Sequence, residues 1–453
     1  MKQKKKFAFS TTQTIMMSFA FAILIGSLLL SLPISSKTGV AVPYIDALFT
    51  ATSATCVTGL VTLSTASAWS LFGQAVILVL IQIGGLGIIT FIVGIMVAFN
   101  RKMGLTDSQL IGDAFNLNSL SGLVQFIKKV ILGTFIIEGI GALLYMTVFV
   151  PQFGLRGVWI SVFNSVSAFC NAGMDVIAEN SLCDYATNPI INAVTSLLII
   201  LGGLGFIVWW DVLRVIKSYK TAKLGCFKKL TLHTKIVLSS TAVLLFGGAI
   251  LIFIFEYNNP LTIGELSIFD KIQASFFQSV TTRTAGFVTI AQENFTNPTA
   301  ILSLILMFIG GSPIGTAGGI KTVTIVVLCA TAYSTINNKN EVSLFNRNLS
   351  RQATRKAVAV TCMSFGIMLA STLMLSAATS ASVIDVLYET VSATATVGLS
   401  RNLTSSLSII GKIIIIATMY LGRIGPISLA IAFQSKKKTQ NSIIDPTEEV
   451  SIG

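Results

Sequence analysis

Charged residues are scarce in this chain of 453 residues: Asp, Glu, Lys and Arg together make up 11% of it, against about 25% in an average soluble domain. The 31 basic and 18 acidic side chains could not cover the surface of a water-soluble fold of this size. Disorder is excluded as well, because hydrophobic residues reach 53% and the mean hydropathy is +0.81, whereas disordered chains are poor in apolar residues. The composition therefore predicts a membrane protein with several spans.

Side chains that bind metals or form disulfides are also few. The chain has one histidine, His233, which we interpret as structural, and six cysteines that form no CxxC pair. Neither a zinc site nor a disulfide framework is indicated, and the cysteines are interpreted as small hydrophobic residues. A membrane-embedded enzyme of lipid metabolism would need paired carboxylates or a histidine cluster, so we do not expect an enzyme.

Long apolar runs, in contrast, are frequent. A helix that crosses a bilayer needs about 20 apolar residues, and eight runs qualify. They lie near residues 13–32, 70–98, 127–150, 189–213, 234–255, 300–335 (interrupted), 356–377 and 407–433. With eight spans both termini share one side, and the segments on that side hold 23 Lys and Arg against five on the other. The positive-inside rule then predicts cytoplasmic termini in a plasma membrane, and topology, not nucleic-acid binding, explains the net charge of +13.

Between the two runs of each pair lies a segment too short to cross the membrane, and these four segments resemble one another. In each, an aromatic residue is followed ten positions later by a glycine, with small and hydroxyl-bearing residues between them. The glycines are Gly59, Gly173, Gly286 and Gly398, at intervals of 114, 113 and 112 residues. Such a period indicates a fourfold internal repeat. The predicted fold class is an all-α membrane protein with four tandem helix–pore-helix–helix repeats around a pseudo-fourfold central pore and eight full spans.

The repeats divide the chain as follows. Repeat 1 covers residues 1–100, repeat 2 covers 101–220, repeat 3 covers 221–340 with an interrupted second helix, repeat 4 covers 341–435, and a cytoplasmic tail covers 436–453. The pore helices are expected at about 44–54, 158–168, 269–281 and 384–393. Because each repeat crosses twice, all copies share one orientation and are related by an axis along the membrane normal.

The stretches around the four glycines are predicted to form an ion filter. Main-chain carbonyl oxygens can replace the hydration shell of a cation, and glycine permits the backbone angles that turn them inward. None of the predicted lining residues carries a charge, which suits a monovalent cation. They are Val57, Thr58, Gly59, Leu60, Asn171, Ala172, Gly173, Met174, Thr284, Ala285, Gly286, Phe287, Thr396, Val397, Gly398 and Leu399.

The second run of repeat 3 is broken by small residues that would be costly in a plain helix. We predict that it forms a gate beneath the filter, although a kink for packing remains an alternative. An ATP-binding loop would need Lys directly after Gly, whereas Ile320 separates Gly319 from Lys321. The predicted gate residues are Gly310, Gly311, Ser312, Pro313, Gly315, Thr316, Ala317, Gly318 and Gly319, with Lys321 and Arg423.

Arg423 lies within the last apolar run, where an arginine is costly unless it faces a cavity or a partner. We predict that it projects into the ion path and limits cation passage; a snorkelling or packed arginine is the alternative. Asp46, Asp270 and Asp385 start three pore helices, where capping of the helix dipole explains them. Arg283 is expected to brace the third filter strand.

The four loops around the glycines, the stretch TTRTAGF (residues 281–287) and the run GGSPIGTAGGIKT (residues 310–322) resemble the Trk/Ktr/HKT superfamily of potassium transporters, in particular its bacterial KtrB branch. The resemblance covers nearly the whole chain. It implies potassium uptake, a potassium-selective filter with glycine at all four corners, a gating loop in repeat 3, and an arginine placed as Arg423 is. It also implies a homodimer with a cytosolic KtrA-type regulatory ring, with nucleotide (ATP or ADP) expected on that partner and no cofactor but potassium ion on this chain.

Sodium dependence, as in a symporter, is common in that branch, but no residue indicates it here. The alternative function is a sodium-coupled secondary transporter of another small solute, which would need a charged site at mid-membrane. The resemblance places residues 446–453 at the dimer interface. The basic stretch 217–235 is a candidate docking surface for the cytosolic partner, and anionic membrane lipid explains it equally well.

Overall fold

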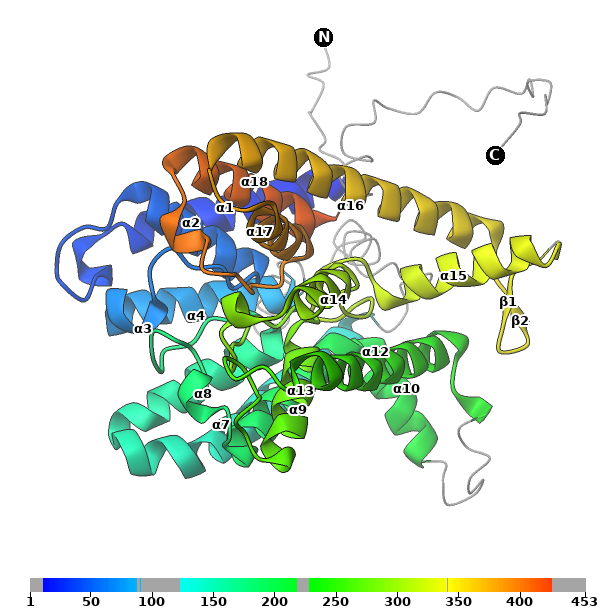
Figure 1. The fold of residues 1–453 in the computed structure, drawn as a ribbon, viewed down its shortest axis with the longest axis horizontal. Coiled ribbons are helices and arrows are strands. Elements are labelled where there is room, and N and C mark those ends of the chain that lie inside the picture. Colours follow the sequence, from blue (N-terminus) through cyan, green and yellow to red (C-terminus); the bar gives the residue numbers. More distant parts are fainter. Residues whose placement is uncertain (1–10, 88–89, 91–122, 218–227, 340, 426–453) are drawn as a thin grey trace, which may run out of the picture.

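The computed structural model describes residues 11–87, 90, 123–217, 228–339 and 341–425 (Figure 1). Predictions that concern residues 1–10, most of the first connector, residues 218–227 and the tail 436–453 lie outside these ranges. Within them the chain is mainly helical; the remainder consists of turns, irregular segments and one hairpin of β1 (Ser343–Leu344) and β2 (Arg347–Asn348). The helices follow a pattern that recurs four times.

The first helix of each repeat is long and apolar. These helices are α1 (Thr11–Leu30), α7 (Leu123–Phe153), α12 (Leu232–Glu256) and α16 (Arg351–Ala378). Among the described residues they alone are single helices long and apolar enough to cross a membrane. Large apolar side chains project outward from them, with Phe21, Leu132, Val243 and Leu373 exposed by 66%, 63%, 71% and 73%. Such an outer surface suits hydrocarbon rather than water.

A short, buried helix follows in each repeat. These helices are α2 (Tyr44–Cys56), α8 (Leu155–Cys170), α13 (Ile268–Thr281) and α17 (Val383–Ala395), in the segments predicted for pore helices. They are rich in Ser and Thr, and several hydroxyls are satisfied within the helix itself. Thr52 Oγ1 donates to Leu48 O at 2.8 Å, for example, and Thr394 Oγ1 to Thr390 O at 2.7 Å. Such local hydrogen bonds allow small polar side chains to be buried at little cost.

The second helices are α4 (Leu71–Leu86), α9 (Pro189–Leu204), α14 (Asn297–Phe308) and α18 (Ile409–Ile424). A short helical turn precedes each of them: α3 (Thr65–Ala68), η2 (Cys183–Tyr185), η4 (Gln292–Asn294) and η5 (Thr404–Ser406). A further turn, η1 (Pro33–Ser35), lies between α1 and α2. Three of the second helices end at a glycine with positive φ, namely Gly87 (82°), Gly205 (88°) and Gly425 (84°).

The interruption that the sequence indicates for repeat 3 is therefore not confined to it. After Gly205 the chain continues as α10 (Phe206–Lys217), bent by 97° from α9. In repeat 3 the break is wider: α14 ends at Phe308, and α15 (Thr322–Ile336) begins only after the segment 309–321, which we call the loop segment. In repeats 1, 2 and 4, one glycine of each cluster allows close contact with the short helix, and another ends the helix that carries it.

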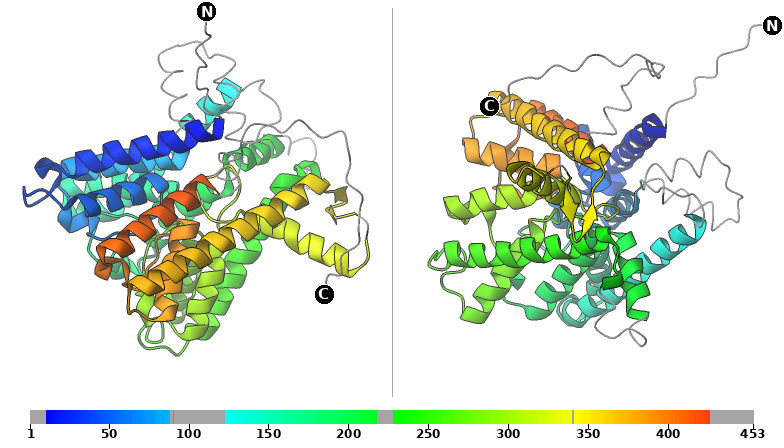
Figure 2. Two further views of the ribbon diagram at one scale, coloured as in Figure 1. Left: turned by 90° about the horizontal axis from the view of Figure 1, so that it is seen from above. Right: turned by 90° about the vertical axis from the view of Figure 1, so that its right-hand side faces the viewer.

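The four repeats adjoin in cyclic order. Helix α4 of repeat 1 packs on α8 of repeat 2, α9 on α13, α14 on α17, and α18 of repeat 4 packs back on α2 of repeat 1. Figure 1 shows this closure, with the orange-red α18 beside the blue α2. In the left view of Figure 2, the yellow α15 and its hairpin lie at the edge of the molecule, away from the blue α1. The short helices are thereby gathered inside a ring of longer ones.

Candidate functional site

The four repeat glycines meet at the centre of this ring. A Cβ atom added to Gly59 would lie 3.2 Å from Cα of both Gly173 and Gly398, and one added to Gly286 would lie 3.1 Å from Cα of Gly173 and 3.3 Å from Cα of Gly398. All four glycines have positive φ, at 98°, 65°, 81° and 95° in chain order. We call residues 57–60, 171–174, 284–287 and 396–399 the corner segments.

Carbonyl oxygens occupy the space beside these glycines. A Cβ on Gly59, Gly173 or Gly286 would come 2.6 Å from the carbonyl oxygen of Ala172, Ala285 or Val397, respectively. A Cβ on Gly398 would meet the carbonyl oxygen of Thr58 in the same way. Each oxygen belongs to the residue before the next glycine around the ring, so one main-chain oxygen lies at every junction. A side chain at any of the four glycine positions would collide with backbone.

The residue two positions before each glycine is left-handed as well. Val57, Asn171, Thr284 and Thr396 have φ of 55°, 59°, 67° and 51°. Three of them are β-branched, for which this conformation is a genuine outlier. Strain of about 1–3 kcal/mol per residue persists only where the surroundings enforce it, and it is typical of functional sites. Its recurrence in all four repeats indicates that the backbone shape is what the repeats share.

Hydroxyl groups of the short helices hold the corner segments in this shape. The amides of Gly59 and Gly398 donate to Ser53 Oγ at 3.1 Å and to Ser392 Oγ at 3.0 Å. In repeat 3, Thr281 Oγ1 donates to the carbonyl of Phe287 at 2.7 Å, and Ser167 does the same to Met174 in repeat 2 at 2.5 Å. The hydroxyl-rich composition of these helices is thus explained. Their C-terminal ends point a partial negative charge at the centre, which favours a cation there.

The loop segment lies directly against two of the corner segments. The amide of Gly318 donates to Thr284 Oγ1 at 3.1 Å, and a Cβ on Gly318 would collide with Thr396 Oγ1. The two ends of the loop are joined, since Gly310 N donates to Ile320 O at 3.0 Å. The segment therefore folds back under the third and fourth corners, next to the ring.

Repeat 2 holds the other half of the loop segment. The amides of Ser312 and Thr316 donate to the carbonyls of Gly203 and Gly202 at 2.9 and 3.1 Å. Beyond the bend at Gly205, the amide of Phe206 donates to Ile314 O at 2.9 Å. The break in α9 thus exposes the backbone groups that bind the loop.

Arg423 and Lys321 also bind the loop segment. Arg423 Nη1 donates to Thr316 O at 2.8 Å, and Nη2 to Gly84 O of repeat 1 at 2.5 Å. Lys321 Nζ donates to Ala317 O at 2.6 Å. Arg423 therefore does not snorkel towards a membrane surface; it points inward and links the loop to α4.

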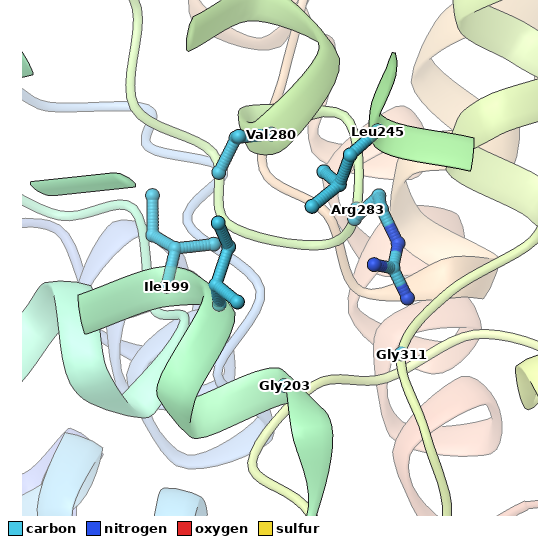
Figure 3. Close-up of a pocket in the computed structure, with 7 residues that line it drawn as sticks. Ile199, Gly203, Leu245, Val280, Arg283 and Gly311 are labelled. Carbon is cyan, nitrogen blue, oxygen red and sulfur yellow. The ribbon is translucent and has the colours of Figure 1, made fainter. Parts of the chain in front are cut away.

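Arg283 lies behind the third corner. It is 7% exposed, its Nη2 is 3.5 Å from Gly310 O, and its Nε has no partner among the described residues. It lines a cavity of about 10 Å³ together with Leu245, Val280 and Gly311 (Figure 3). This places Arg283 between its corner segment and the start of the loop segment, as expected of a bracing residue.

Two ion pairs at the short helices carry no signal in the sequence. Asp46 binds Lys412 Nζ of repeat 4 at 2.6 Å, and Asp385 binds Arg401 Nε of its own repeat at 2.8 Å. The interpretation of these aspartates as helix caps alone is therefore incomplete, whereas Asp270 has its N-cap Ser267 as its partner. Lys412 is 366 residues from Asp46 and Arg401 is 16 residues from Asp385, so no helical or strand periodicity pairs them.

The buried Glu138 of α7 likewise has its partner in another repeat. Gln82 Nε2 donates to its two oxygens at 3.1 and 3.3 Å. Within the part of the chain that the structure describes, no three His, Cys, Asp or Glu side chains gather into a metal site. The ring of carbonyl oxygens is the candidate functional site on geometry alone.

Comparisons with known proteins show the family to which the chain belongs. Residues 1–443 match the TrkH family, described as a cation transport protein. The chain is 39% identical to the Ktr system potassium uptake protein B of Bacillus subtilis over 98% of this chain and 97% of the relative. It is 37% identical to the potassium/sodium uptake protein NtpJ of Enterococcus hirae, over 100% and 99% of the two chains.

Its fold is also similar to the crystal structure of the potassium transporter TrkH from Vibrio parahaemolyticus, with a TM-score of 0.75 and 15% identity over 95% of this chain and 87% of that one. The family match and the relatives establish the class of the protein as a membrane transporter of cations. The chain belongs to the TrkH family of cation transport proteins.

Proposed function

We propose that this protein takes up potassium ions across the plasma membrane through the ring of corner segments. The observation that carries the proposal is the set of four main-chain carbonyl oxygens, one at each junction between neighbouring glycines. Uncharged oxygens in a fixed ring can replace the water around a monovalent ion and still release it. The names of the relatives, potassium uptake and potassium/sodium uptake proteins, support the choice of ion.

The loop segment and Arg423 act as the gate in this proposal. The loop is hydrogen-bonded next to the third and fourth corners, and Arg423 brings a positive charge to it. A cation that leaves the ring on this side must displace the loop and pass the arginine. The bonds that hold the loop come from backbone groups of repeat 2, from the Thr284 hydroxyl of repeat 3 and from the Arg423 side chain of repeat 4, so movement of any of these repeats would weaken its attachment.

In the membrane, each repeat would cross as its long first helix and its interrupted second helix, giving eight crossings with cytoplasmic termini. The four long helices support the first half of this arrangement. No ATP-binding motif is present in the sequence, and existing gradients suffice: a monovalent cation that enters a negative interior gains about 2.3 kcal/mol per 100 mV.

A multi-subunit assembly belongs to the same proposal: a homodimer, with a nucleotide-binding ring on its cytosolic face. The name of the Bacillus relative, protein B of a Ktr system, supports partner subunits. The basic stretch 217–235 is the proposed docking surface, and its described residues Lys228 and Lys229 are exposed. Deletion of residues 446–453 should abolish dimerisation in size-exclusion chromatography with light scattering; intact dimers would refute a role for the tail.

Uptake of radiolabelled potassium and rubidium into proteoliposomes that contain the purified chain tests the function. We expect uptake that follows an inside-negative potential and is inhibited by excess unlabelled potassium more strongly than by excess sodium. Equal inhibition by sodium would indicate a cation pathway without potassium preference. Uptake of sodium without any potassium or rubidium would overturn the proposal and favour a sodium-coupled transporter.

A further inference from the structure

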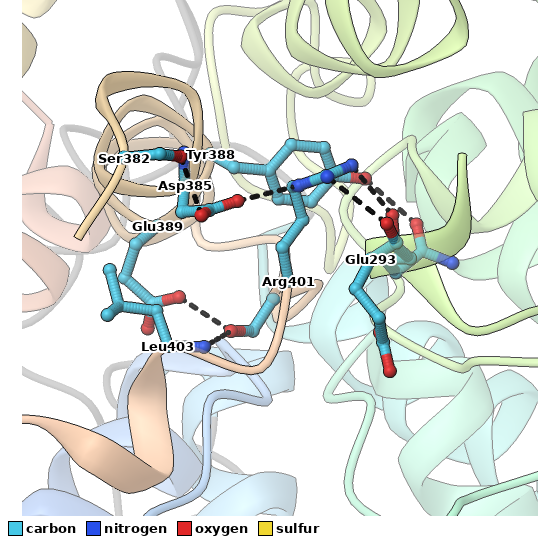
Figure 4. Close-up of polar contacts among 9 residues, drawn as sticks. Glu293, Ser382, Asp385, Tyr388, Glu389, Arg401 and Leu403 are labelled. Atoms are coloured by element: carbon cyan, nitrogen blue, oxygen red, sulfur yellow. Dashed lines mark hydrogen bonds and ion pairs between the residues drawn. The ribbon is translucent and has the colours of Figure 1, made fainter. Parts of the chain in front are cut away.

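Arg401 joins the fourth corner segment to repeat 3. It lies two residues after Leu399, and its guanidinium group makes three hydrogen bonds (Figure 4). Nε donates to Asp385 Oδ1 of its own repeat at 2.8 Å, Nη1 donates to Gln292 O at 2.9 Å, and Nη2 to Glu293 O at 3.2 Å. The Arg401 side chain is 12% exposed; its bonds to Asp385 and Gln292 are partly buried, and its bond to Glu293 is exposed.

The acceptors of Arg401 are themselves fixed. The side-chain amide of Gln292 exchanges hydrogen bonds with that of Gln278 on α13, at 2.8 and 3.2 Å, and it also accepts from Tyr388 OH on α17 at 2.8 Å. Turn η4, which contains Gln292, is therefore held between the short helices of repeats 3 and 4. Arg401 binds to a rigid part of its neighbour.

The chain between Leu399 and Arg401 is anchored as well. Ser400 Oγ donates to Glu389 Oε2 at 2.7 Å, and Thr404 Oγ1 donates to the other oxygen of this fully buried carboxylate at 2.5 Å. A displacement of the guanidinium group would thus be passed along a short, tethered strand to the corner segment. Glu389 binds this strand to its own repeat through Ser400 and Thr404, and Arg401 binds it to repeat 3.

At the other junctions, no charged side chain among the described residues directly after a corner segment bonds to the neighbouring repeat. Val288, directly after the third corner segment, is bonded to repeat 2 through neutral groups, with Leu182 N donating to its carbonyl at 2.9 Å. Repeats 4 and 1 are joined by the Lys412–Asp46 ion pair, which lies between α18 and α2 and not in a strand that leaves a corner segment. At their own junction, repeats 2 and 3 are joined by neutral groups; for example, Gln273 Nε2 donates to Ala186 O at 3.2 Å. Lys412 therefore provides a matched control: it is a buried cation that also binds the first turn of a short helix.

We propose that Arg401 is a positioning residue that fixes the fourth corner relative to the third and thereby sets the potassium-over-sodium preference of the ring. The inference rests on the function proposed above. Val397 O, the oxygen at the junction of these two corners, belongs to the strand that Arg401 anchors. Without the Arg401 bonds, Val397 O could move closer to the axis. The ring would then coordinate the smaller sodium ion better than the wild-type ring does, and the preference for potassium would fall.

The test is uptake of potassium and of sodium by the full-length protein in proteoliposomes, expressed as the ratio of the two rates. Arg401→Gln should lower this ratio by about tenfold, as expected from loss of about 1.4 kcal/mol of differential binding. Arg401→Lys keeps the charge but not the planar fork that serves three acceptors, so its ratio should lie between those of Arg401→Gln and the wild type. Lys412→Gln should keep the wild-type ratio, even where it lowers the melting temperature.

A wild-type ratio in a folded Arg401→Gln protein would overturn the inference, and so would an equal loss of the ratio in Lys412→Gln, since that would indicate general loosening. Should Arg401→Gln not fold, Tyr388→Phe replaces it, because it removes the hydrogen bond to Gln292 and leaves Arg401 in place. A lowered ratio then supports the inference, and an unchanged ratio contradicts it. Failure of the proposed function is distinct, because the wild-type protein itself would then carry no potassium.

Discussion

The second helices of repeats 2 and 3 are both interrupted at the level of the ring, but in different ways. In repeat 2 a single residue, Gly205, turns the chain by 97°. In repeat 3 the break is the loop segment 309–321, which folds back under the corner segments. The difference separates two features: the helix end at a glycine of positive φ, which repeats 1, 2 and 4 share, and the longer loop segment, which among the described residues belongs to repeat 3.

The close approach of the second helix to the short helix explains the common part. Gly84, Gly202 and Gly422 leave no room for a Cβ atom, because the carbonyl oxygens of Thr55, Phe169 and Thr394 lie there. Each of these oxygens is four residues before the glycine of its corner segment. The small residues that allow this contact also weaken the helix.

Repeat 3 breaks this pattern. The corresponding glycine, Gly310, meets Gly318 O of the loop segment instead of a carbonyl of α13. The loop thus takes the place that the short helix occupies in the other three repeats. This replacement brings the loop to the ring and is the reason why the proposed gate belongs to repeat 3.

The ring glycines of repeats 2 and 3 should be equally important for transport, and their substitution is expected to have the largest effect on potassium uptake. Gly173→Ser and Gly286→Ser each place a side chain against backbone carbonyls of the neighbouring corner. We expect both to lower potassium uptake in proteoliposomes by about 100-fold, since a displacement of about 1 Å in a precise site has an effect of that order. Gly247→Ser, where an added Cβ meets nothing within 4 Å, is the control. Normal uptake by either corner variant would contradict the assignment of the ring.

Release of the loop segment should raise potassium uptake rather than lower it. Arg423→Gln removes the bond to Thr316 O and a positive charge next to the loop. We expect potassium uptake to rise by about tenfold, the effect of roughly 1–2 kcal/mol that a unit charge near the ion path can have. Lys412→Gln removes a charge from the same helix, α18, at its other end and should leave the uptake rate unchanged. A decrease in uptake by Arg423→Gln would contradict the gate.

The glycines that end α9 and α18 sharpen the comparison further. Gly205 and Gly425 have φ of 88° and 84°, but only Gly205 faces the loop, with Pro313 O where a Cβ would be. Both Gly→Ala variants should lose about 1–2 kcal/mol of stability through backbone strain, measured by thermal unfolding in detergent. Only Gly205→Ala should also raise basal uptake, by a few-fold. Equal uptake by the two variants would show that repeat 2 does not hold the loop.

The smallest effect is expected at the starts of the short helices. Asp46→Asn breaks an ion pair whose side chains are 10% and 15% exposed, so we expect a loss of about 2 kcal/mol, somewhat below that of a fully buried pair. Asp270→Asn removes a carboxylate whose hydrogen bond within the described part of the chain is to its N-cap serine, and the loss should cost about 0.5 kcal/mol. Thermal unfolding at matched detergent concentration compares them. Equal losses would indicate that Asp46, like Asp270, acts only as a cap.

The parts of this arrangement that were predictable from the sequence are those encoded locally. The position of each short helix and of the glycine after it follows from a pattern of a dozen residues that recurs four times. The loop segment was predictable because its small residues interrupt an apolar run. Gly84 and Gly202, in contrast, belong to clusters that indicate packing or a break equally well, and only the backbone angles of Gly87 and Gly205 distinguish the two.

Contacts between repeats could not be predicted. In the sequence, Lys412 is a single charge within an apolar run, and its partner Asp46 is 366 residues away. Glu138 and Gln82 are 56 residues apart on different helices. Such pairs depend on how the repeats are placed around the axis, which no single stretch of sequence records. Arg401 has the same origin, since its acceptors are carbonyl groups of another repeat.

The most direct measurement is the position of a bound ion. Crystals of the protein grown with rubidium or thallium in place of potassium give an anomalous signal that locates the heavy cation without reference to the protein atoms. The account predicts a peak on the axis between Gly59, Gly173, Gly286 and Gly398, within coordination distance of their neighbouring carbonyl oxygens. Peaks only elsewhere, with this axis empty at saturating rubidium, would contradict it.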